Sequence, residues 1–187
     1  MRPNKWLEAP LLFLHLAATA LAIGPALFFG AIVAPAAFRV LPTRDLAASL
    51  TSPVLSGACV LAEVAFGVLF ATGWWLTRRD APRVTRSLLT RLPVAGFFAA
   101  LVIRELLIPP MDRIRAEAPG LIDNLPAADP ARILLDRYHR LATGLFTAML
   151  AVAIAILFLT ARLVSIARSA PPPAASRPPV PKLLDLS

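Results

Sequence analysis

Few residues of this sequence could do chemistry, and Glu63 and Arg104 are the most informative because each interrupts a long apolar stretch. A charged side chain at the centre of a bilayer costs about 2.5–3.5 kcal/mol on insertion scales, so a carboxylate at that depth needs a reason. The two stretches would run antiparallel, which leaves an axial gap of about 9 Å that a long Arg side chain can largely cover. We expect an ion pair. The alternatives are a Glu63 kept neutral by apolar surroundings, or a carboxylate that couples to a proton or a solute.

Two histidines, His15 and His139, suggest haem or copper ligation, because membrane cytochromes use paired histidines. With four spans, His15 near the start of the first and His139 near the start of the last would lie on opposite sides of the membrane. One metal ion could hardly reach both, and we expect no metal site and no cofactor. His139 lies instead in "DRYHRL", which is typical of a polar ring at a membrane interface.

Other reactive groups are scarce. The connecting segments contain no nucleophile with a nearby base, no phosphate-binding glycine loop and no paired carboxylate motif. The single cysteine, Cys59, lies inside an apolar stretch, so the chain has neither an intramolecular disulfide nor the cysteine spacing of a zinc site. We therefore expect no catalytic residues and no enzymatic activity.

Membrane-spanning helices are the elements that must position these side chains. Of the 187 residues, 58% are hydrophobic, and the mean hydropathy is +0.71. Soluble domains average about 45–50% apolar residues. The charged residues, 16% of the chain, gather in the gaps between four apolar stretches. The pattern predicts an all-α integral membrane four-helix bundle with spans at about 11–38, 53–76, 87–108 and 130–164.

Proline and tryptophan set the expected ends of the middle spans. Pro53 suits the first helical position of the second span, and Trp74 and Trp75 suit the interface at its end. Pro109 and Pro110 are expected to stop the third span, because proline cannot continue a helix.

In the first span, Pro25 after Gly24 predicts a kink. A secretory signal peptide is the alternative for this segment, but its apolar region would be only about 7–15 residues long. We therefore expect an uncleaved helix. The fourth span is expected to begin with Asp129 as N-cap and Pro130 at the first helical position, its first two turns projecting from the bilayer.

Each span offers one face of small or polar residues, which we expect to look into the bundle. Glu105 follows Arg104 onto a different face and is expected to extend toward the headgroups. The four faces are His15, Thr19, Ala22 and Ala26; Ser52, Ser56, Cys59, Glu63 and Gly67; Gly96, Ala100 and Arg104; and His139, Thr143, Thr147 and Ala151.

The distribution of Lys and Arg predicts the orientation. Eleven lie on the side of the N-terminus, the second connection and the tail, and seven lie on the other side, which places both termini in the cytoplasm. The net charge of +8 is spread around the spans and forms no continuous basic face, so we expect no nucleic acid partner. Residues 1–168 are expected to form the transmembrane domain and the Pro-rich residues 169–187 a flexible cytoplasmic tail.

Three motifs resemble the four-helix membrane family typified by transmembrane protein 205, over roughly residues 11–165. They are "GPALFFGAIVAPAAFRVLP", "IPPMDRIR" and "LLDRYHRLATGLF". The matching positions are Phe38, Arg39, Leu41 and Pro42 in the first, and Tyr138, His139, Ala142 and Thr143 in the last. The chain departs from many bacterial relatives at Ile23, Ala142 and Phe146, where they carry Trp, Ser and Asn. The resemblance implies a membrane fold but supplies no activity. A more distant likeness is to copper-resistance and protoporphyrinogen-oxidising four-helix proteins.

These features lead us to expect a non-enzymatic, multi-pass protein of a bacterial inner membrane, whose partner is the lipid bilayer. Transport or efflux of a small solute is the leading hypothesis, because a polar face surrounds Glu63. A structural or assembly role, as a homo-oligomer or a subunit of a larger membrane complex, is the alternative. A haem- or quinone-linked redox protein is a third, less favoured one.

Overall fold

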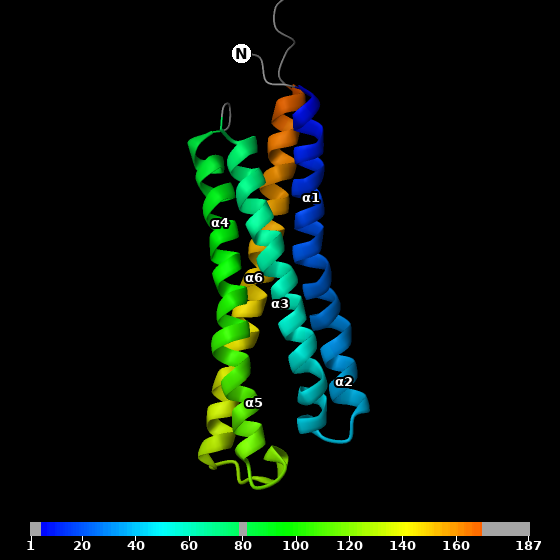
Figure 1. Ribbon diagram of the computed structural model, residues 1–187, viewed down its shortest axis with the longest axis vertical. Coiled ribbons are helices and arrows are strands. Elements are labelled where there is room, and N and C mark those ends of the chain that lie inside the picture. Colours follow the sequence, from blue (N-terminus) through cyan, green and yellow to red (C-terminus); the bar gives the residue numbers. More distant parts are fainter. Residues whose placement is uncertain (1–4, 79–81, 170–187) are drawn as a thin grey trace, which may run out of the picture.

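Four long helical rods run side by side in the computed structural model, which describes residues 5–78 and 82–169, with the side chains of 9–78 and 82–165. Each rod contacts two neighbours, in the cyclic order first, second, third, fourth (Figure 1). The first rod comprises α1 (Lys5–Phe28), the π-helix η1 (Phe29–Val33) and α2 (Ala34–Val40), and the second is α3 (Arg44–Leu76). The third comprises α4 (Arg83–Leu101), the π-helix η2 (Val102–Leu107) and α5 (Ile108–Glu117), and the fourth is α6 (Pro130–Ser169). A short 3-10 helix, η3 (Ile122–Asn124), lies before α6.

All four rods are long and apolar enough to cross a membrane: Ala9–Val40, Arg44–Leu76, Arg83–Glu117 and Pro130–Ser165. Large apolar side chains point outward from them, among them Phe13, Phe28 and Phe158, each more than half exposed. Water-soluble proteins rarely expose such an apolar surface, whereas lipid tails cover it. The predicted all-α four-helix membrane bundle is therefore confirmed.

Both ends of the bundle are easily identified. The start of α1, the end of α3, the start of α4 and the end of α6 lie together at one end, which we call the N-terminal end (Figure 1). The connections 41–43 and 118–129 lie at the opposite end, which we call the loop end (Figure 1). The proposed tail falls almost wholly outside the described residues.

The N-caps explain two helix starts. Asp129 Oδ1 accepts a hydrogen bond of 2.8 Å from the backbone N–H of Ala131, as the sequence predicts for the start of α6. At the start of α3, Thr43 Oγ1 accepts from the N–H of Leu46 at 3.2 Å. The prediction that the second span opens at Pro53 was therefore wrong, because this proline lies inside a helix that begins nine residues earlier, at Arg44. Membrane helices tolerate internal proline where neighbouring helices and polar side chains compensate.

The prediction that Pro109 and Pro110 end the third span was also wrong, because the rod continues to Glu117. In a regular helix each proline ring would clash with the carbonyl four residues earlier. Those carbonyls, of Glu105 and Leu106, lie in the π-helical η2, where the Ile108 N–H bonds to the carbonyl of Ile103, five residues earlier and not four. The first rod has the same arrangement, because the π-helix η1 directly precedes α2, which contains Pro35 near its start.

Close contacts between small and large residues hold α3 against α4. The Phe66 ring is fully buried over Gly96, where an added Cβ would lie only 2.4–2.7 Å from ring atoms. At Gly73 an added Cβ would lie 2.7 Å from the carbonyl oxygen of Leu89. Gly73 is therefore required by the close approach of the two backbones, and Gly96 by the Phe66 ring that covers it.

Candidate functional site: a polar face on α3

The predicted ion pair is present. Arg104 donates from Nε to Glu63 Oε1 at 2.8 Å and from Nη2 to Oε2 at 3.0 Å, a two-pronged contact between η2 and α3. Bidentate pairs of this kind are the strong form of the interaction. The Glu63 side chain is 12% exposed and that of Arg104 is 28% exposed on the isolated chain. The pair therefore lies at the surface of the bundle and not in its centre.

Glu105 adds a second carboxylate to this pair. Its Oε1 contacts Nη1 of Arg104, and its side chain is 51% exposed. The expectation that Glu105 turns away toward the headgroups was therefore wrong. Both residues belong to the π-helical segment η2, whose wider turns alter the spacing of successive side chains from that of an α-helix.

The polar face of α3 is longer than the sequence suggested. At 100° per residue, Asp45 and Ser49 fall on the same side as Ser52, Ser56, Cys59 and Glu63. Cys59 is buried on this face, and Ser52, Ser56 and Glu63 are half-buried. Gly67, predicted to continue the face, is exposed. The polar face of α3 is these six residues, Asp45, Ser49, Ser52, Ser56, Cys59 and Glu63.

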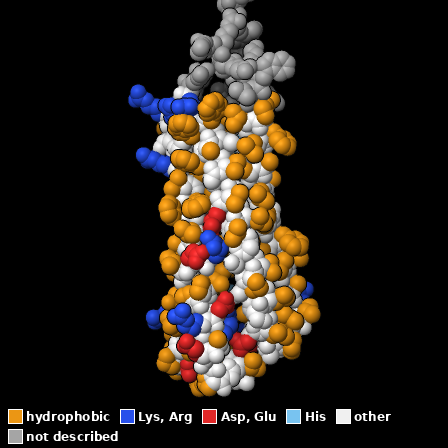
Figure 2. All heavy atoms as spheres, viewed as in Figure 1, with side chains coloured by type: hydrophobic (Ala, Val, Ile, Leu, Met, Phe, Trp, Pro, Cys, Tyr) orange, Lys and Arg blue, Asp and Glu red, His pale blue; other side chains and the backbone are white. Residues whose placement is uncertain are grey.

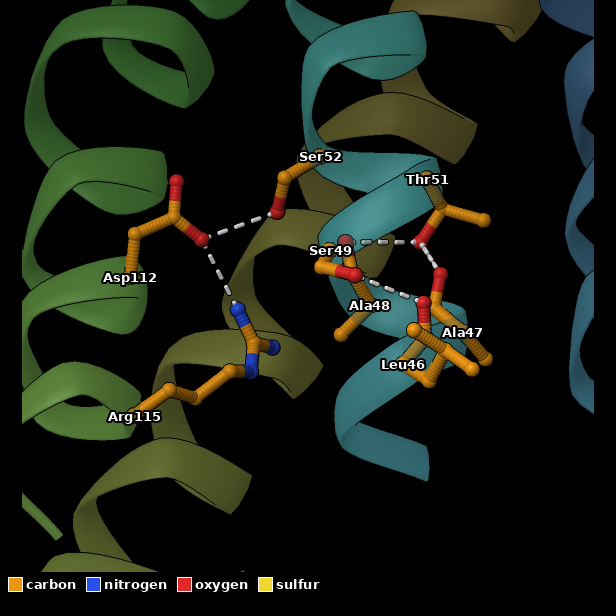
Figure 3. Close-up of polar contacts among 8 residues, drawn as sticks. All are labelled: Leu46, Ala47, Ala48, Ser49, Thr51, Ser52, Asp112 and Arg115. Carbon is orange, nitrogen blue, oxygen red and sulfur yellow. Dashed lines mark hydrogen bonds and ion pairs between the residues drawn. The ribbon is translucent and has the colours of Figure 1, made fainter. Parts of the chain in front are cut away.

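An open pocket of about 440 Å³ lies where this face meets α5 at the loop end. Ser52 Oγ donates to Asp112 Oδ1 at 3.0 Å, and Arg115 Nη1 binds the same oxygen at 2.9 Å (Figure 3). Figure 3 shows Ser52 and Asp112 pointing toward each other across the space between α3 and α5. The lining residues are Asp45, Ser49, Ser52, Pro53, Asp112, Arg115, Ala116, Gly120 and Leu121.

The connection before α6 closes one side of this pocket. Asp45 Oδ2 accepts a hydrogen bond of 2.7 Å from the backbone N–H of Ile122. The neighbouring Arg44 donates its backbone N–H to Asp123 Oδ2 at 3.3 Å. These two bonds attach η3 to the first turn of α3, so this wall of the pocket is fixed to α3.

Charges of both signs line the pocket and the face above it, and the acidic groups are in excess. Asp45, Glu63, Glu105 and Asp112 oppose only Arg104 and Arg115. Figure 2 shows acidic and basic side chains together halfway along this side of the bundle and again near the loop end, with a hollow beside the lower group. The arrangement favours a cationic over an anionic ligand.

A second polar cluster ties three helices together toward the N-terminal end. The His15 side chain is fully buried, with Nδ1 2.7 Å from Thr72 Oγ1 on α3 and Nε2 3.0 Å from Thr160 Oγ1 on α6. Thr19 Oγ1 donates to the His15 carbonyl at 2.8 Å. The predicted inward face of the first span is confirmed, because His15, Thr19, Ala22 and Ala26 are all buried.

His139 is far from this cluster. It is exposed on α6, 21 residues before Thr160, which places it about 31 Å along the helix from the residue that contacts His15. The prediction that His139, Thr143, Thr147 and Ala151 face inward was wrong, because all four are exposed. The two threonine hydroxyls donate to carbonyls of their own helix, and Ala142, Met149, Ala153 and Ile156 form the buried face instead.

The residues of the family resemblance lie toward the loop end. Phe38 and Arg39 on α2 and Pro42 after it are exposed, whereas Tyr138 on α6 packs against the core. None of them lines the pocket. Within the described residues, no group of three or more His, Cys, Asp or Glu side chains could hold a metal ion. Comparison with protein-family models, with curated proteins and with solved structures finds no match.

Proposed function

We propose that this protein moves a small cationic solute across a membrane along the polar face of α3. The observation that carries the proposal is the continuity of this face. It begins in the pocket at the loop end, and Glu63 lies 11 residues beyond Ser52, about 16 Å deeper along the helix. A polar face that extends to that depth is unusual for purely structural residues, because polar groups at membrane depth are costly.

The charge and hydrogen bonding of the face favour this role. Carboxylates outnumber guanidiniums there, so a cation would restore the balance of charge. Ser56, midway between the pocket and Glu63, makes no hydrogen bond with the described residues, in contrast to Thr51, whose hydroxyl donates to Ala47 of its own helix. A hydroxyl oxygen without a partner can accept from an ammonium group.

Flux measurements on purified protein in liposomes test the proposal, with methylammonium as the solute. Glu63→Gln is expected to abolish uptake of labelled methylammonium while helix content remains unchanged, because the amide removes the negative charge at the inner end of the face. Since Glu63→Gln also weakens the contact with Arg104, a charge exchange is the matched control. The double variant Glu63→Arg and Arg104→Glu rebuilds the ion pair with its partners exchanged.

The charge exchange separates a transport role from a structural one. If the carboxylate on α3 binds the solute, the double variant folds but stays inactive. Recovery of wild-type flux in the double variant would show that Glu63 and Arg104 act only as a structural ion pair. It would contradict the proposal that the solute binds at Glu63 on α3. If the wild type itself carries no methylammonium, the assembly role becomes the better proposal, favoured by the exposure of Glu105 and Arg104 on the outside of the bundle.

The cellular setting proposed with this function is a bacterial inner membrane, with both termini in the cytoplasm. The excess of Lys and Arg on the side of the termini supports that orientation. In this orientation the pocket at the loop end opens to the outside. Membership of the family typified by transmembrane protein 205 is proposed from the three motifs alone and adds no substrate.

A further inference from the structure

Three exposed arginines lie together where α3 passes to α4, and we call Arg78, Arg83 and Arg86 the arginine cluster. Arg83 and Arg86 are three residues apart on α4 and therefore neighbours on its surface. Arg86 Nη2 donates to the carbonyl oxygen of Arg78 at 2.9 Å, which joins the start of α4 to the end of α3. The three guanidiniums thus belong to one surface at the N-terminal end.

This cluster has no acidic partner among the side chains of 9–78 and 82–165. The ion pairs found there involve Arg44, Arg104 and Arg115 only. The acidic side chains within those ranges lie at mid-height or toward the loop end, from Glu63 and Glu105 onward. Figure 2 shows basic side chains beside apolar ones near the N-terminal end of this face, and acidic groups only lower down.

Two tryptophans contact Arg78 of the cluster. The Arg78 guanidinium carbon lies 3.8 Å from the Trp74 ring centroid and 5.4 Å from that of Trp75. The tryptophans are 46% and 48% exposed. Indole rings prefer the headgroup level of a bilayer, and stacking on them orients the guanidinium without consuming its N–H donors.

We propose that the arginine cluster binds the phosphate of an anionic phospholipid, whose acyl chains lie against the apolar surface next to Trp74 and Trp75. The planar Arg fork matches phosphate oxygens in a bidentate manner. The contact of the cluster with exposed apolar rings selects a lipid over free phosphate, because only the lipid covers both. This inference is independent of the proposed transport route.

Native mass spectrometry of the full chain in detergent tests the site, with phosphatidylglycerol and phosphatidylcholine titrated separately. The wild type is expected to retain phosphatidylglycerol more tightly, and inorganic phosphate is expected not to displace it. The triple variant Arg78→Gln, Arg83→Gln and Arg86→Gln is expected to lose about a hundredfold in affinity, at roughly fivefold for each arginine.

The matched control is Arg113→Gln, Arg137→Gln and Arg140→Gln, three exposed arginines toward the loop end. It removes the same charge and is expected to leave retention unchanged. Equal losses in the two triple variants would overturn the proposal, since binding would then follow net charge alone. Equal retention of the two lipids by the wild type would also overturn it, and this comparison needs no variant to fold. Displacement by inorganic phosphate would refute the lipid as the ligand.

Discussion

At the scale of single residues, the bridge from His15 to Thr72 and Thr160 contains a choice of hydrogen bonds. Thr72 Oγ1 also lies 2.7 Å from the Val68 carbonyl oxygen, and Thr160 Oγ1 lies 2.8 Å from that of Ile156. A neutral imidazole donates from one nitrogen and accepts at the other. One threonine must therefore donate its only hydroxyl proton to His15 and not to its own helix, so the bridge links α1 to both α3 and α6.

Replacement of Thr160 by valine tests this bridge. The change leaves Nε2 of a fully buried imidazole without a partner. We expect a loss of about 1 kcal/mol in the free energy of unfolding, since hydrogen bonds between membrane helices average about 0.6 kcal/mol and reach about 1.7. Chemical unfolding in mixed micelles, followed by circular dichroism, measures the difference.

Thr147→Val is the control on the same helix. The Thr147 hydroxyl is exposed and donates to the Thr143 carbonyl of its own turn, so the change should stay within about 0.5 kcal/mol. Equal destabilisation by both substitutions would show that the contact with His15 contributes no stability.

The sequence predicted the Glu63 and Arg104 contact because an unpaired charge at membrane depth is expensive and a long Arg side chain can cover the axial gap between the two residues. The sequence did not predict that Asp112 and Arg115 join the polar face of α3 in one site, because Pro109 and Pro110 were expected to end the helix before them. Asp45 and Ser49 carried a readable signal, since they continue the spacing of Ser52, Ser56 and Cys59. That signal was missed because the helix was predicted to start at Pro53, after both residues.

At the scale of helices, the two π-helical segments explain where pattern reading failed. A sequence rule that stops a helix at proline treats the backbone as a regular α-helix. The backbone instead widens over Phe29–Val33 and Val102–Leu107, directly ahead of the prolines, and continues. Pattern rules that assume α-helical hydrogen bonding do not include such a widened turn, so they end the helix too early.

The contact between α3 and α4 leads to a prediction at this scale. Gly96→Ala places a methyl group within 2.7 Å of the Phe66 ring, which is fully buried and would have to shift within the packed core. Overpacking of this kind costs about 1–3 kcal/mol. We expect a lower midpoint of thermal unfolding in detergent, measured by the loss of helical signal.

Gly67→Ala supplies the opposite expectation on α3. No atom lies within 4 Å of the added Cβ, and alanine favours a helix over glycine by up to about 1 kcal/mol. This variant should be as stable as the wild type or more so. A Gly96→Ala protein no less stable than Gly67→Ala would mean that the two helices do not approach so closely.

At the scale of the whole molecule, hydropathy and charge gaps sufficed to predict four spans and their antiparallel order, because lipid demands long apolar segments. The inward faces were harder to predict. That of the first span was identified correctly from small and polar residues, whereas that of the fourth was not. The Thr143 and Thr147 hydroxyls on α6 donate hydrogen bonds to carbonyls of their own helix. A polar stripe on this helix therefore did not have to face the bundle.

Sidedness gives a prediction for the complete protein. In a Cys59→Ala background, Val84→Cys is exposed at the N-terminal end and Asn124→Cys at the loop end. A membrane-impermeant maleimide should label Asn124→Cys in intact bacterial cells and Val84→Cys only in inverted vesicles. Labelling of both positions from one side would contradict the four-span arrangement, and the reverse pattern would contradict cytoplasmic termini.

The position of Glu63, a little past the midpoint of α3, has an electrical consequence for the proposed route. A unit charge that crosses a membrane potential exchanges about 2.3 kcal/mol per 100 mV with the field. A cation that reached Glu63 from the pocket would already have traversed a large part of that field. Its occupancy of the position would therefore respond to voltage, and a negative interior would draw it inward without any chemical fuel.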